Sequence, residues 1–311
     1  MKRKLRIGTR ASQLALTQSD WVREQILTLL PGVEVELVRI STKGDRILDV
    51  PLAKVGGKGL FVKEIEEALL SEEIDLAVHS MKDVPTVLPD GLHIGIVPQR
   101  EEARDAFVSA RFGSLADLPE QAVAGTSSLR RKAQLLALRP DLQIRDLRGN
   151  VGTRLSRLDN GDFDAIILAG AGLRRLDLHD RIGALLPPEQ MLPAIGQGAL
   201  GIELRKSDTE LLEQLQALHH RETALTVAAE RAYLARLEGG CQVPIGAHAA
   251  LADNQLSLTG LIASVDGQTL LKESFSAPAA DAERLGRELA EELLGRGGKQ
   301  ILEAVYQASL S

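Results

Sequence analysis

The alternation of strand and helix patterns over the first two-thirds of the chain constrains the fold more than any other feature. Apolar side chains have helical spacing in residues 11–30 and 61–70. Strand patterns surround these helices at residues 5–8, 33–40, 76–79 and 92–97, and a second series that begins near Arg104 has them at 106–109, 123–125, 143–147 and 165–169. Such alternation predicts two α/β lobes with mainly parallel sheets.

The pattern changes from about Thr223 on. One helix leads to a glycine-rich loop, three alternating strands follow at 248–251, 255–264 and 269–275, and two helices finish the chain. Asp253-Asn254 and Asp266-Gly267 are typical turn pairs between such strands. The sequence therefore predicts a C-terminal α+β domain with a three-stranded antiparallel sheet.

Residues 192–204 look like a crossover back toward the first lobe. We expect three domains, which comprise residues 1–98 plus 199–217, residues 104–193, and residues 221–311. Two α/β lobes joined by a pair of crossovers suggest a cleft between hinged lobes, and ligands of open α/β sheets bind at the carboxyl ends of the strands. The sequence has no internal repeat and no low-complexity tract.

Composition limits the class of protein. Hydrophobic residues make up 44% of the 311 residues and charged residues 26%, as in globular proteins. No apolar run is long enough to span a membrane, and the basic start lacks the apolar stretch of a secretory signal. Together with a single cysteine, these features predict a cytoplasmic protein.

Positive charge is concentrated in residues 126–157. Eight cations, seven of them arginine, stand there against Asp141 and Asp146, so the segment carries +6 and the remainder -12 of the net charge of -6. The planar guanidinium of arginine can donate two hydrogen bonds to one carboxylate or phosphate, so this concentration of arginine predicts an anionic ligand. Nucleic acid is the weaker alternative, because aromatic residues are 3% of the chain, none lies in this segment, and the acidic remainder would repel a polyanion.

Two segments after strands look like anion sites. The first is Gly-Thr-Ser-Ser-Leu-Arg-Arg at residues 125–131, and the second is Leu-Arg-Gly-Asn-Val-Gly-Thr-Arg at residues 147–154. Hydroxyl groups at a helix N-terminus, backbone N–H groups and nearby arginines favour anions. Each could also be an ordinary N-cap with solvated arginines, although two in one lobe make that interpretation weaker.

The first lobe has polar residues at strand ends as well. Asp83, beside Lys82, follows the strand at 76–79 and could oppose a cationic transition state, or could be a helix cap beside a surface lysine. His79 on that strand is expected to be structural. Arg10, with Thr9 and Ser12, adds an anion contact at the end of the first strand.

A long glycine-rich connection covers residues 42–61. Loops of this length are usually functional or disordered. Lys54 and Lys58 make the segment a candidate lid over an anionic ligand.

Cys241 is the only cysteine and lies in Glu-Gly-Gly-Cys-Gln-Val-Pro-Ile-Gly at residues 238–246. It has no partner for an internal disulfide, so it is either a small buried hydrophobe or a nucleophile. Gly239, Gly240 and Pro244 oppose a helix and favour an exposed loop.

Six segments together, in chain order, resemble the porphobilinogen deaminase family, also called hydroxymethylbilane synthases. They are Arg-Ile-Gly-Thr-Arg-Ala-Ser-Gln-Leu-Ala, His-Ser-Met-Lys-Asp-Val-Pro, Gly-Thr-Ser-Ser-Leu-Arg-Arg, Leu-Arg-Gly-Asn-Val, Gly-Gln-Gly-Ala and the cysteine segment. The resemblance runs over the whole chain. It implies two lobes like type II periplasmic binding proteins, with a third domain.

The resemblance also implies an activity. It is a transferase of tetrapyrrole (haem) synthesis, which joins four porphobilinogen units head to tail with loss of ammonia and then releases hydroxymethylbilane by hydrolysis. The implied cofactor is a dipyrromethane primer, attached by a thioether to Cys241. The implied partner is a small molecule, with no metal, nucleic acid or membrane, and the family suggests a monomer.

The residues of the implied site match this sequence one by one. Asp83 matches the catalytic aspartate. The cofactor-binding set is Cys241, Lys82, Asp83, Thr126, Ser127, Ser128, Arg130, Arg131, Arg148 and Gly149. The substrate-binding set is Arg10, Ser12, Gln18, Arg148, Arg154 and Arg175, and the lid residues are Lys54, Lys58 and Phe61.

Two other classes share part of the pattern. A non-catalytic anion-binding module would use the lobes and arginines but would need neither Cys241 nor Asp83. A cysteine hydrolase would need a histidine base near Cys241. His248 is the nearest histidine in sequence, and its place in an expected strand gives no reason to pair the two.

Overall fold

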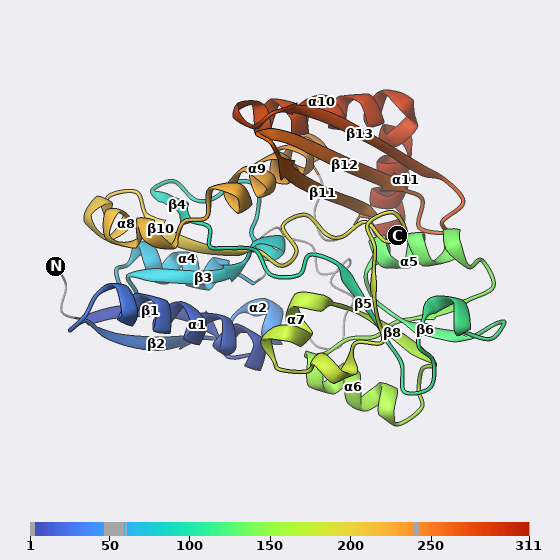
Figure 1. Ribbon diagram of the computed structural model, residues 1–311, viewed down its shortest axis with the longest axis horizontal. Coiled ribbons are helices and arrows are strands. Elements are labelled where there is room, and N and C mark those ends of the chain that lie inside the picture. Colours follow the sequence, from blue (N-terminus) through green and yellow to red (C-terminus); the bar gives the residue numbers. More distant parts are fainter. Residues whose placement is uncertain (1–3, 47–58, 60, 239–242, 311) are drawn as a thin grey trace. The chain divides into compact units, whose positions relative to one another are not determined.

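The computed structural model describes residues 4–46, 59, 61–238 and 243–310 (Figure 1). Their contacts divide the chain into two compact units. Unit 1 comprises Met1–Asp49, Gly57–Glu101 and Ala199–Ala224, and unit 2 comprises Val50–Gly56, Glu102–Gly198 and Leu225–Ser311. Unit 2 thus contains both the expected second lobe and the expected C-terminal domain, and the division into three domains stays a prediction.

Unit 1 is built on one five-stranded sheet in the order β2-β1-β3-β10-β4. β1 is parallel to β2 and β3, whereas β10 is antiparallel to β3 and β4. Its elements are β1 (Lys4–Arg10), α1 (Gln13–Leu29), β2 (Glu34–Ile40), α2 (Lys43–Arg46), α4 (Lys63–Leu70), β3 (Leu76–Ser80), η1 (Met81–Asp83), β4 (Leu92–Ile96), β10 (Leu200–Arg205), α8 (Thr209–Leu215) and η4 (Gln216–Leu218).

Helices cover both faces of this sheet. Val22 and Ile26 of α1 pack with Leu5 and Ile7 of β1 on one face, together with side chains of α8. Side chains of α4 form a second core on the other face with Ala77 of β3. Alternate residues of each strand therefore serve opposite layers, as an α/β/α sandwich requires.

Unit 2 contains a second five-stranded sheet, in the order β7-β6-β8-β5-β9. β6 is parallel to β7 and β8, and β5 is antiparallel to β8 and β9. Its elements are β5 (Asp105–Val108), η2 (Leu115–Asp117), β6 (Val123–Gly125), α5 (Leu129–Leu138), β7 (Gln143–Arg145), α6 (Val151–Asp159), β8 (Ala165–Ala169), α7 (Gly170–Arg175), η3 (His179–Arg181) and β9 (Ala184–Leu186).

The expectation of mainly parallel sheets holds for strand direction, since all strands of each five-stranded sheet run the same way except one. The exceptions are β10 and β5, which run against both of their neighbours. The chain enters β5 from β4 and β10 from β9, each time from a strand of the other sheet, so neither strand follows the local strand–helix–strand pattern that makes neighbours parallel.

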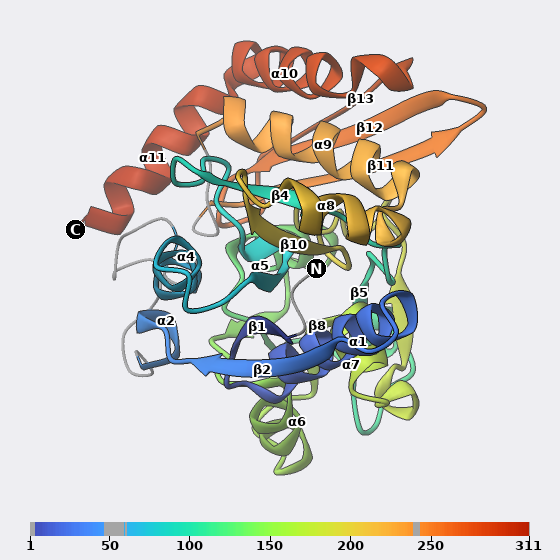
Figure 2. The same cartoon turned by 90° about the vertical axis from the view of Figure 1, so that its left-hand side faces the viewer.

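The C-terminal part of unit 2 confirms the expected antiparallel sheet, in the order β11-β12-β13. Helices α9, α10 and α11 share one core with it (Figures 1 and 2). Asp253 and Asn254 both have positive φ, as the predicted turn requires. The elements are α9 (Arg221–Arg236), β11 (Ile245–Ala252), β12 (Gln255–Ala263), β13 (Leu270–Pro278), η5 (Ala279–Asp281), α10 (Ala282–Leu293), η6 (Leu294–Gly298) and α11 (Lys299–Leu310).

The other face of the C-terminal sheet packs on the second lobe. Leu261 and Ala263 of β12 form a small core with Ala133 of α5 and with Leu192. This contact orients α5, whose first turn carries Arg130 and Arg131, relative to the domain that carries Cys241.

Candidate functional site

Three hydroxyl residues, at positions 126–128, form the connection between β6 and α5. The Ser128 Oγ accepts from the Arg131 N–H at 3.4 Å and so caps α5 as predicted, and the Thr126 Oγ1 accepts from the Ser128 N–H at 3.2 Å. The Ser127 Oγ bonds both backbone groups of Leu147, with its oxygen 3.1 Å from the carbonyl oxygen and 3.0 Å from the nitrogen. Ser127 thereby holds the two predicted anion-binding segments side by side.

The second of these segments turns sharply into α6. Gly149 has a φ of +106°, and a Cβ there would lie 2.9 Å from the Thr153 side chain, so glycine is required. The N-cap of α6 is Asn150, whose Oδ1 accepts from the Thr153 N–H at 2.8 Å. The Arg154 Nε donates to the Gly149 carbonyl at 2.8 Å, which fixes this guanidinium against the turn.

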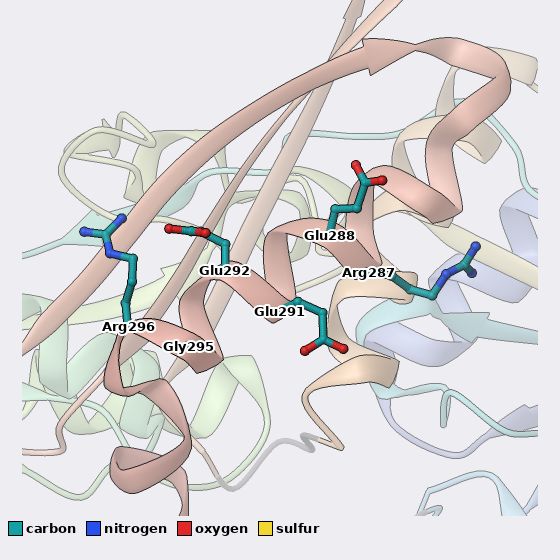
Figure 3. Close-up of a pocket in the computed structure, with 6 residues that line it drawn as sticks. All are labelled: Arg287, Glu288, Glu291, Glu292, Gly295 and Arg296. Atoms are coloured by element: carbon teal, nitrogen blue, oxygen red, sulfur yellow. The ribbon is translucent and has the colours of Figure 1, made fainter.

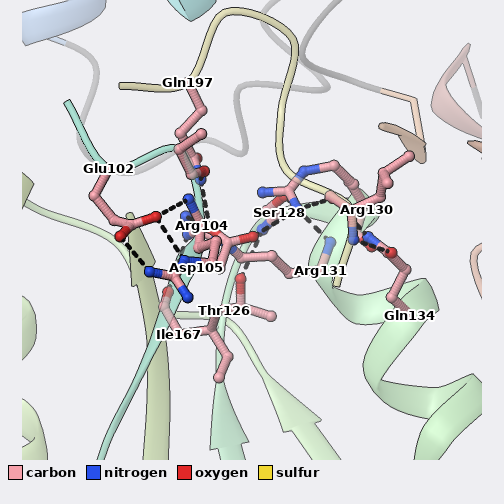
Figure 4. Close-up of polar contacts among 12 residues, drawn as sticks. Glu102, Arg104, Asp105, Thr126, Ser128, Arg130, Arg131, Gln134, Ile167 and Gln197 are labelled. Carbon is pink, nitrogen blue, oxygen red and sulfur yellow. Dashed lines mark hydrogen bonds and ion pairs between the residues drawn. The ribbon is translucent and has the colours of Figure 1, made fainter. Parts of the chain in front are cut away.

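Arg130 and Arg131 are buried, with 5% and 7% of their surface exposed. Both donate to Asp105, a fully buried carboxylate at the start of β5 (Figure 4). Burial opposes the ionisation of Asp105, but the charges of Arg130 and Arg131 outweigh it, so its pKa lies well below the usual range. The two arginines thus have an internal partner in addition to their predicted role toward the cofactor.

Three guanidinium groups lie within electrostatic reach of one another near these turns. Burial lowers the pKa of Arg154 to about 10, and the charges of Arg131 and Arg148 contribute to the decrease. Other arginines of the basic segment are neutralised locally, since Arg139 pairs with Asp141 at 2.7 Å and Arg157 with Asp162 at 2.9 Å. The positive charge that remains gathers at the strand ends, where an anion would relieve the repulsion.

Further members of the predicted substrate set lie at other positions. The Arg175 Nη2 donates to the Gly198 carbonyl at 2.8 Å in unit 2. In unit 1, Ser12 caps α1 by accepting from the Ala15 N–H at 3.3 Å, and Gln18 of α1 is buried. The Arg10 guanidinium lies 4.2 Å from the centre of the Phe61 ring, so the predicted lid residue Phe61 contacts a predicted substrate-binding arginine.

Asp83 ends η1, a short turn directly after β3. The Met81 N–H donates to the Ala199 carbonyl at 3.0 Å and the Val84 N–H to the Met81 carbonyl at 3.3 Å, so backbone bonds hold the turn. Lys82 and Asp83 are both partly buried. His79 is structural, as expected, because its Nε2 lies 2.9 Å from Glu203 Oε2 in the buried interior.

Three predicted residues, Cys241, Lys54 and Lys58, lie outside the described residues. The chain on either side of Cys241 is described. Leu237 and Val243 are buried in the C-terminal core, so both flanks of the cysteine segment are anchored.

Asp105 is the residue of the candidate site that the sequence did not reveal. It belongs to no recognised motif, and an acidic residue before an apolar strand is an ordinary strand start. Only its burial against two arginines distinguishes it.

A cavity of about 580 Å³ lies on α10 and η6 (Figure 3). Its lining is Arg287, Glu288, Glu291, Glu292, Gly295 and Arg296, none of which belongs to the predicted site. Arg287 pairs with Glu283 and Arg296 with Glu273, which is typical of a solvated charged helix face.

Within the described residues, no group of three or more His, Cys, Asp or Glu side chains could hold a metal ion. In the same part of the chain, no helix combines the length and the apolar character that crossing a membrane requires.

Comparisons with known proteins identify the family. The family model "Porphobilinogen deaminase, dipyromethane cofactor binding domain" matches residues 5–213, and "Porphobilinogen deaminase, C-terminal domain" matches residues 224–295. The porphobilinogen deaminase of Syntrophotalea carbinolica is 60% identical over 97% of this chain and 96% of its own. That of Geobacter sulfurreducens is 57% identical over 99% and 96%.

The periplasmic aliphatic sulphonate binding protein of Escherichia coli is a distant structural likeness, 15% identical with a TM-score of 0.40 over 76% of this chain and 71% of its own. The fold class rests on the sheet topology described above. The two α/β sheets and the antiparallel C-terminal sheet confirm the predicted architecture.

The chain therefore belongs to the porphobilinogen deaminase family. The resemblance seen in the six motifs is confirmed, and so is the expected transferase of tetrapyrrole synthesis at the level of this family. Residues 5–213 match the family model that is named for binding the dipyrromethane cofactor.

Proposed function

We propose that this chain condenses four porphobilinogen units head to tail with loss of ammonia, on a dipyrromethane primer joined by a thioether to Cys241, and releases hydroxymethylbilane by hydrolysis. We further propose that it does so as a cytoplasmic monomer without nucleic acid. The guanidinium cluster around Arg154, in the domain that matches the cofactor-binding family model, carries the proposal.

The described residues fit a ligand with several carboxylates. Porphobilinogen has acetate and propionate side chains, so each added pyrrole brings two carboxylates. The charges of Arg131 and Arg148 add to the effect of burial in lowering the pKa of Arg154, and an anionic ligand would relieve this repulsion. Thr126, Ser127, Ser128 and Gly149 border the same turns and would contact the bound chain. When bound, the primer supplies the pyrrole carbon to which the next unit is added.

Asp83 is proposed to act on the reacting pyrrole. Loss of ammonia from porphobilinogen leaves a cation, and a fixed carboxylate stabilises positive charge on the pyrrole nitrogen and can accept a proton. The backbone bonds of η1 fix the position of Asp83, which lowers the cost of ordering it at the moment of reaction.

The thioether is tested by intact mass. We expect purified protein to exceed the mass of its sequence by one dipyrromethane, to keep that mass after denaturation, and to lose it in Cys241→Ser, because a hydroxyl is a far poorer nucleophile than a thiolate. Peptide mapping locates the adduct. An active parent protein of unmodified mass would disprove the proposal, and an adduct that persists in Cys241→Ser would move the attachment elsewhere.

A further inference from the structure

Asp105 is buried completely at the start of β5, and three side chains donate to it (Figure 4). Arg130 Nη1 lies 2.7 Å from Oδ2, and Arg131 approaches Oδ1 with both Nε at 3.1 Å and Nη2 at 2.7 Å. Gln197 Nε2 adds a third donor to Oδ1 at 3.0 Å. Both carboxylate oxygens are therefore occupied, and Asp105 is the shared partner of the two guanidiniums, each of which also donates to one backbone carbonyl, that of Leu192 or Ile167.

Arg130 connects this carboxylate to the backbone that leads toward the C-terminal domain. Its Nη1 also donates to the Leu192 carbonyl at 2.7 Å, and Gln134 bonds both backbone groups of Leu192. The next residue along, Pro193, accepts from the Ala247 N–H at 3.1 Å. Asp105 is thus linked through Arg130 to the backbone beside β11.

The Arg130 side chain also lies against the segment that follows Cys241. A Cβ at Gly246 would be 3.3 Å from the Arg130 Cδ and 3.1 Å from the Leu192 carbonyl oxygen. A side chain at Gly246 would therefore press on both, which shows how closely Arg130 and this part of the chain pack. A displacement of Arg130 would therefore disturb both an arginine of the predicted cofactor set and the chain beside the attachment cysteine.

We propose that Asp105 is the positioning residue for cofactor assembly: it fixes Arg130 and Arg131 so that their remaining surplus of positive charge is directed at the carboxylates of the primer. The inference rests on the proposed function. One carboxylate between two buried guanidiniums neutralises half of their charge, which permits both to be buried side by side and still leaves a net charge for an anion. Arg148 and Arg154 add to that charge.

Asp75 in unit 1 provides a matched control, because it is also a buried carboxylate between two arginines. Only 1% of its side chain is exposed, Arg6 Nη2 lies 3.2 Å from its Oδ1, and Arg205 Nη2 lies 3.8 Å from the same atom. None of these three residues belongs to the predicted site. The same substitutions at Asp75 therefore measure the effect of disturbing a buried carboxylate–arginine pair that lies outside the predicted site.

The experiment compares Asp105→Glu and Asp105→Asn with Asp75→Glu and Asp75→Asn in the full chain. The readouts are the fraction of molecules that carry the adduct by intact mass, the absorbance with an aldehyde reagent for pyrroles, and the thermal midpoint. We expect Asp105→Glu, which keeps the charge but moves it by one methylene, to fold about as stably as Asp75→Glu and to lose most of the adduct and of the pyrrole absorbance. Both Asp75 variants should keep them.

Full adduct in folded Asp105→Glu would overturn the inference, as would an equal loss of adduct in the two Glu variants. If Asp105→Asn does not fold, the comparison of the Glu variants still decides. A parent protein without the adduct would instead overturn the proposed function, and this inference with it.

Discussion

The sheet of unit 1 and the sheet of unit 2 have the same arrangement of strands but different polar groups. In both, three parallel strands are followed by an antiparallel one, β10 in unit 1 and β5 in unit 2. The backbone agrees in detail, since the Met81 N–H donates to Ala199 and the Gly170 N–H to Arg104, each at 3.0 Å. A serine caps the helix that follows the middle one of the three parallel strands in each, Ser12 after β1 and Ser128 after β6. The same scaffold therefore presents different chemistry at the same strand ends.

The contrast is strongest in the buried carboxyl groups. Asp105 faces two guanidiniums, which hold its pKa below the usual range despite complete burial. Glu66 of α4 in unit 1 has the opposite environment. Burial raises the pKa of Glu66 to about 7, the charge of Glu203 adds to the increase, and His79 opposes it. The difference shows that the sign of the nearby charges, and not burial alone, decides whether a buried carboxyl group stays ionised.

The largest expected effect is on catalysis in unit 1. Asp83→Asn should fold and keep the covalent adduct, but its turnover should fall by about 10²–10⁴-fold, because the amide cannot oppose a cationic transition state or accept a proton. The measurement is steady-state formation of hydroxymethylbilane. Asp90→Asn, an exposed carboxylate of the same unit, should leave the rate unchanged. Near-parental turnover in Asp83→Asn would mean that the catalytic role lies elsewhere.

The second prediction compares the contributions of two arginines of unit 2 to stability. Arg131 pairs with a buried carboxylate, whereas Arg154 lies near other guanidinium groups. Arg131→Met should lower the free energy of unfolding by about 3–5 kcal/mol, because Asp105 loses one of its guanidiniums. Arg154→Met should raise it by about 1 kcal/mol at pH 7, since the cation is disfavoured when folded. In the parent, this penalty is present below the folded pKa and is relieved as pH rises through about 10.

Urea unfolding at pH 7 measures both changes. Arg154→Met should nevertheless impair tetrapyrrole formation, because its charge is proposed to hold carboxylates. If Arg154→Met proved as destabilising as Arg131→Met, the two arginines would have equivalent structural roles and the contrast between them would be lost.

The smallest expected effect is a pH dependence that arises in unit 1. The pKa of Glu66 is raised on folding, so its contribution to stability is fully present below about 4.5 and is lost as pH rises through about 7. Glu66→Gln should remove about 1–3 kcal/mol from the change in the free energy of unfolding between low and high pH. The variant should therefore be more stable than the parent above pH 7. Unfolding midpoints between pH 4.5 and 8 would measure it.

Glu67→Gln is the control, because Glu67 is the exposed neighbour on the same helix and its charge is the smallest of the causes that shift the pKa of Glu66. Its pH dependence should stay close to that of the parent. A parental profile in Glu66→Gln would assign the pH dependence to another group.

The secondary structure could be predicted from the sequence because its signals are local. The apolar spacing of residues 61–70 produces α4, the short apolar segment 123–125 forms β6, and Ser128 caps α5 where a hydroxyl precedes the helix. Local signals failed where packing decided. Trp21, one of the apolar residues in the predicted first helix, is 43% exposed, whereas its neighbour Val22 is buried in the core. The short strand β9 and helix α8 were also missed.

The sequence by itself determined which residue types stand after each strand, and six motifs were enough to identify the family, because glycines, caps and arginines act within a few residues of one another. Only the tertiary structure decided which charges are paired. Asp105 meets Arg130 and Arg131 across 25 and 26 positions, and His79 meets Glu203 across 124, because antiparallel insertion of β5 and β10 brings distant residues together. The energy of a buried charge depends on its neighbours in space, and no local pattern of residues contains that information.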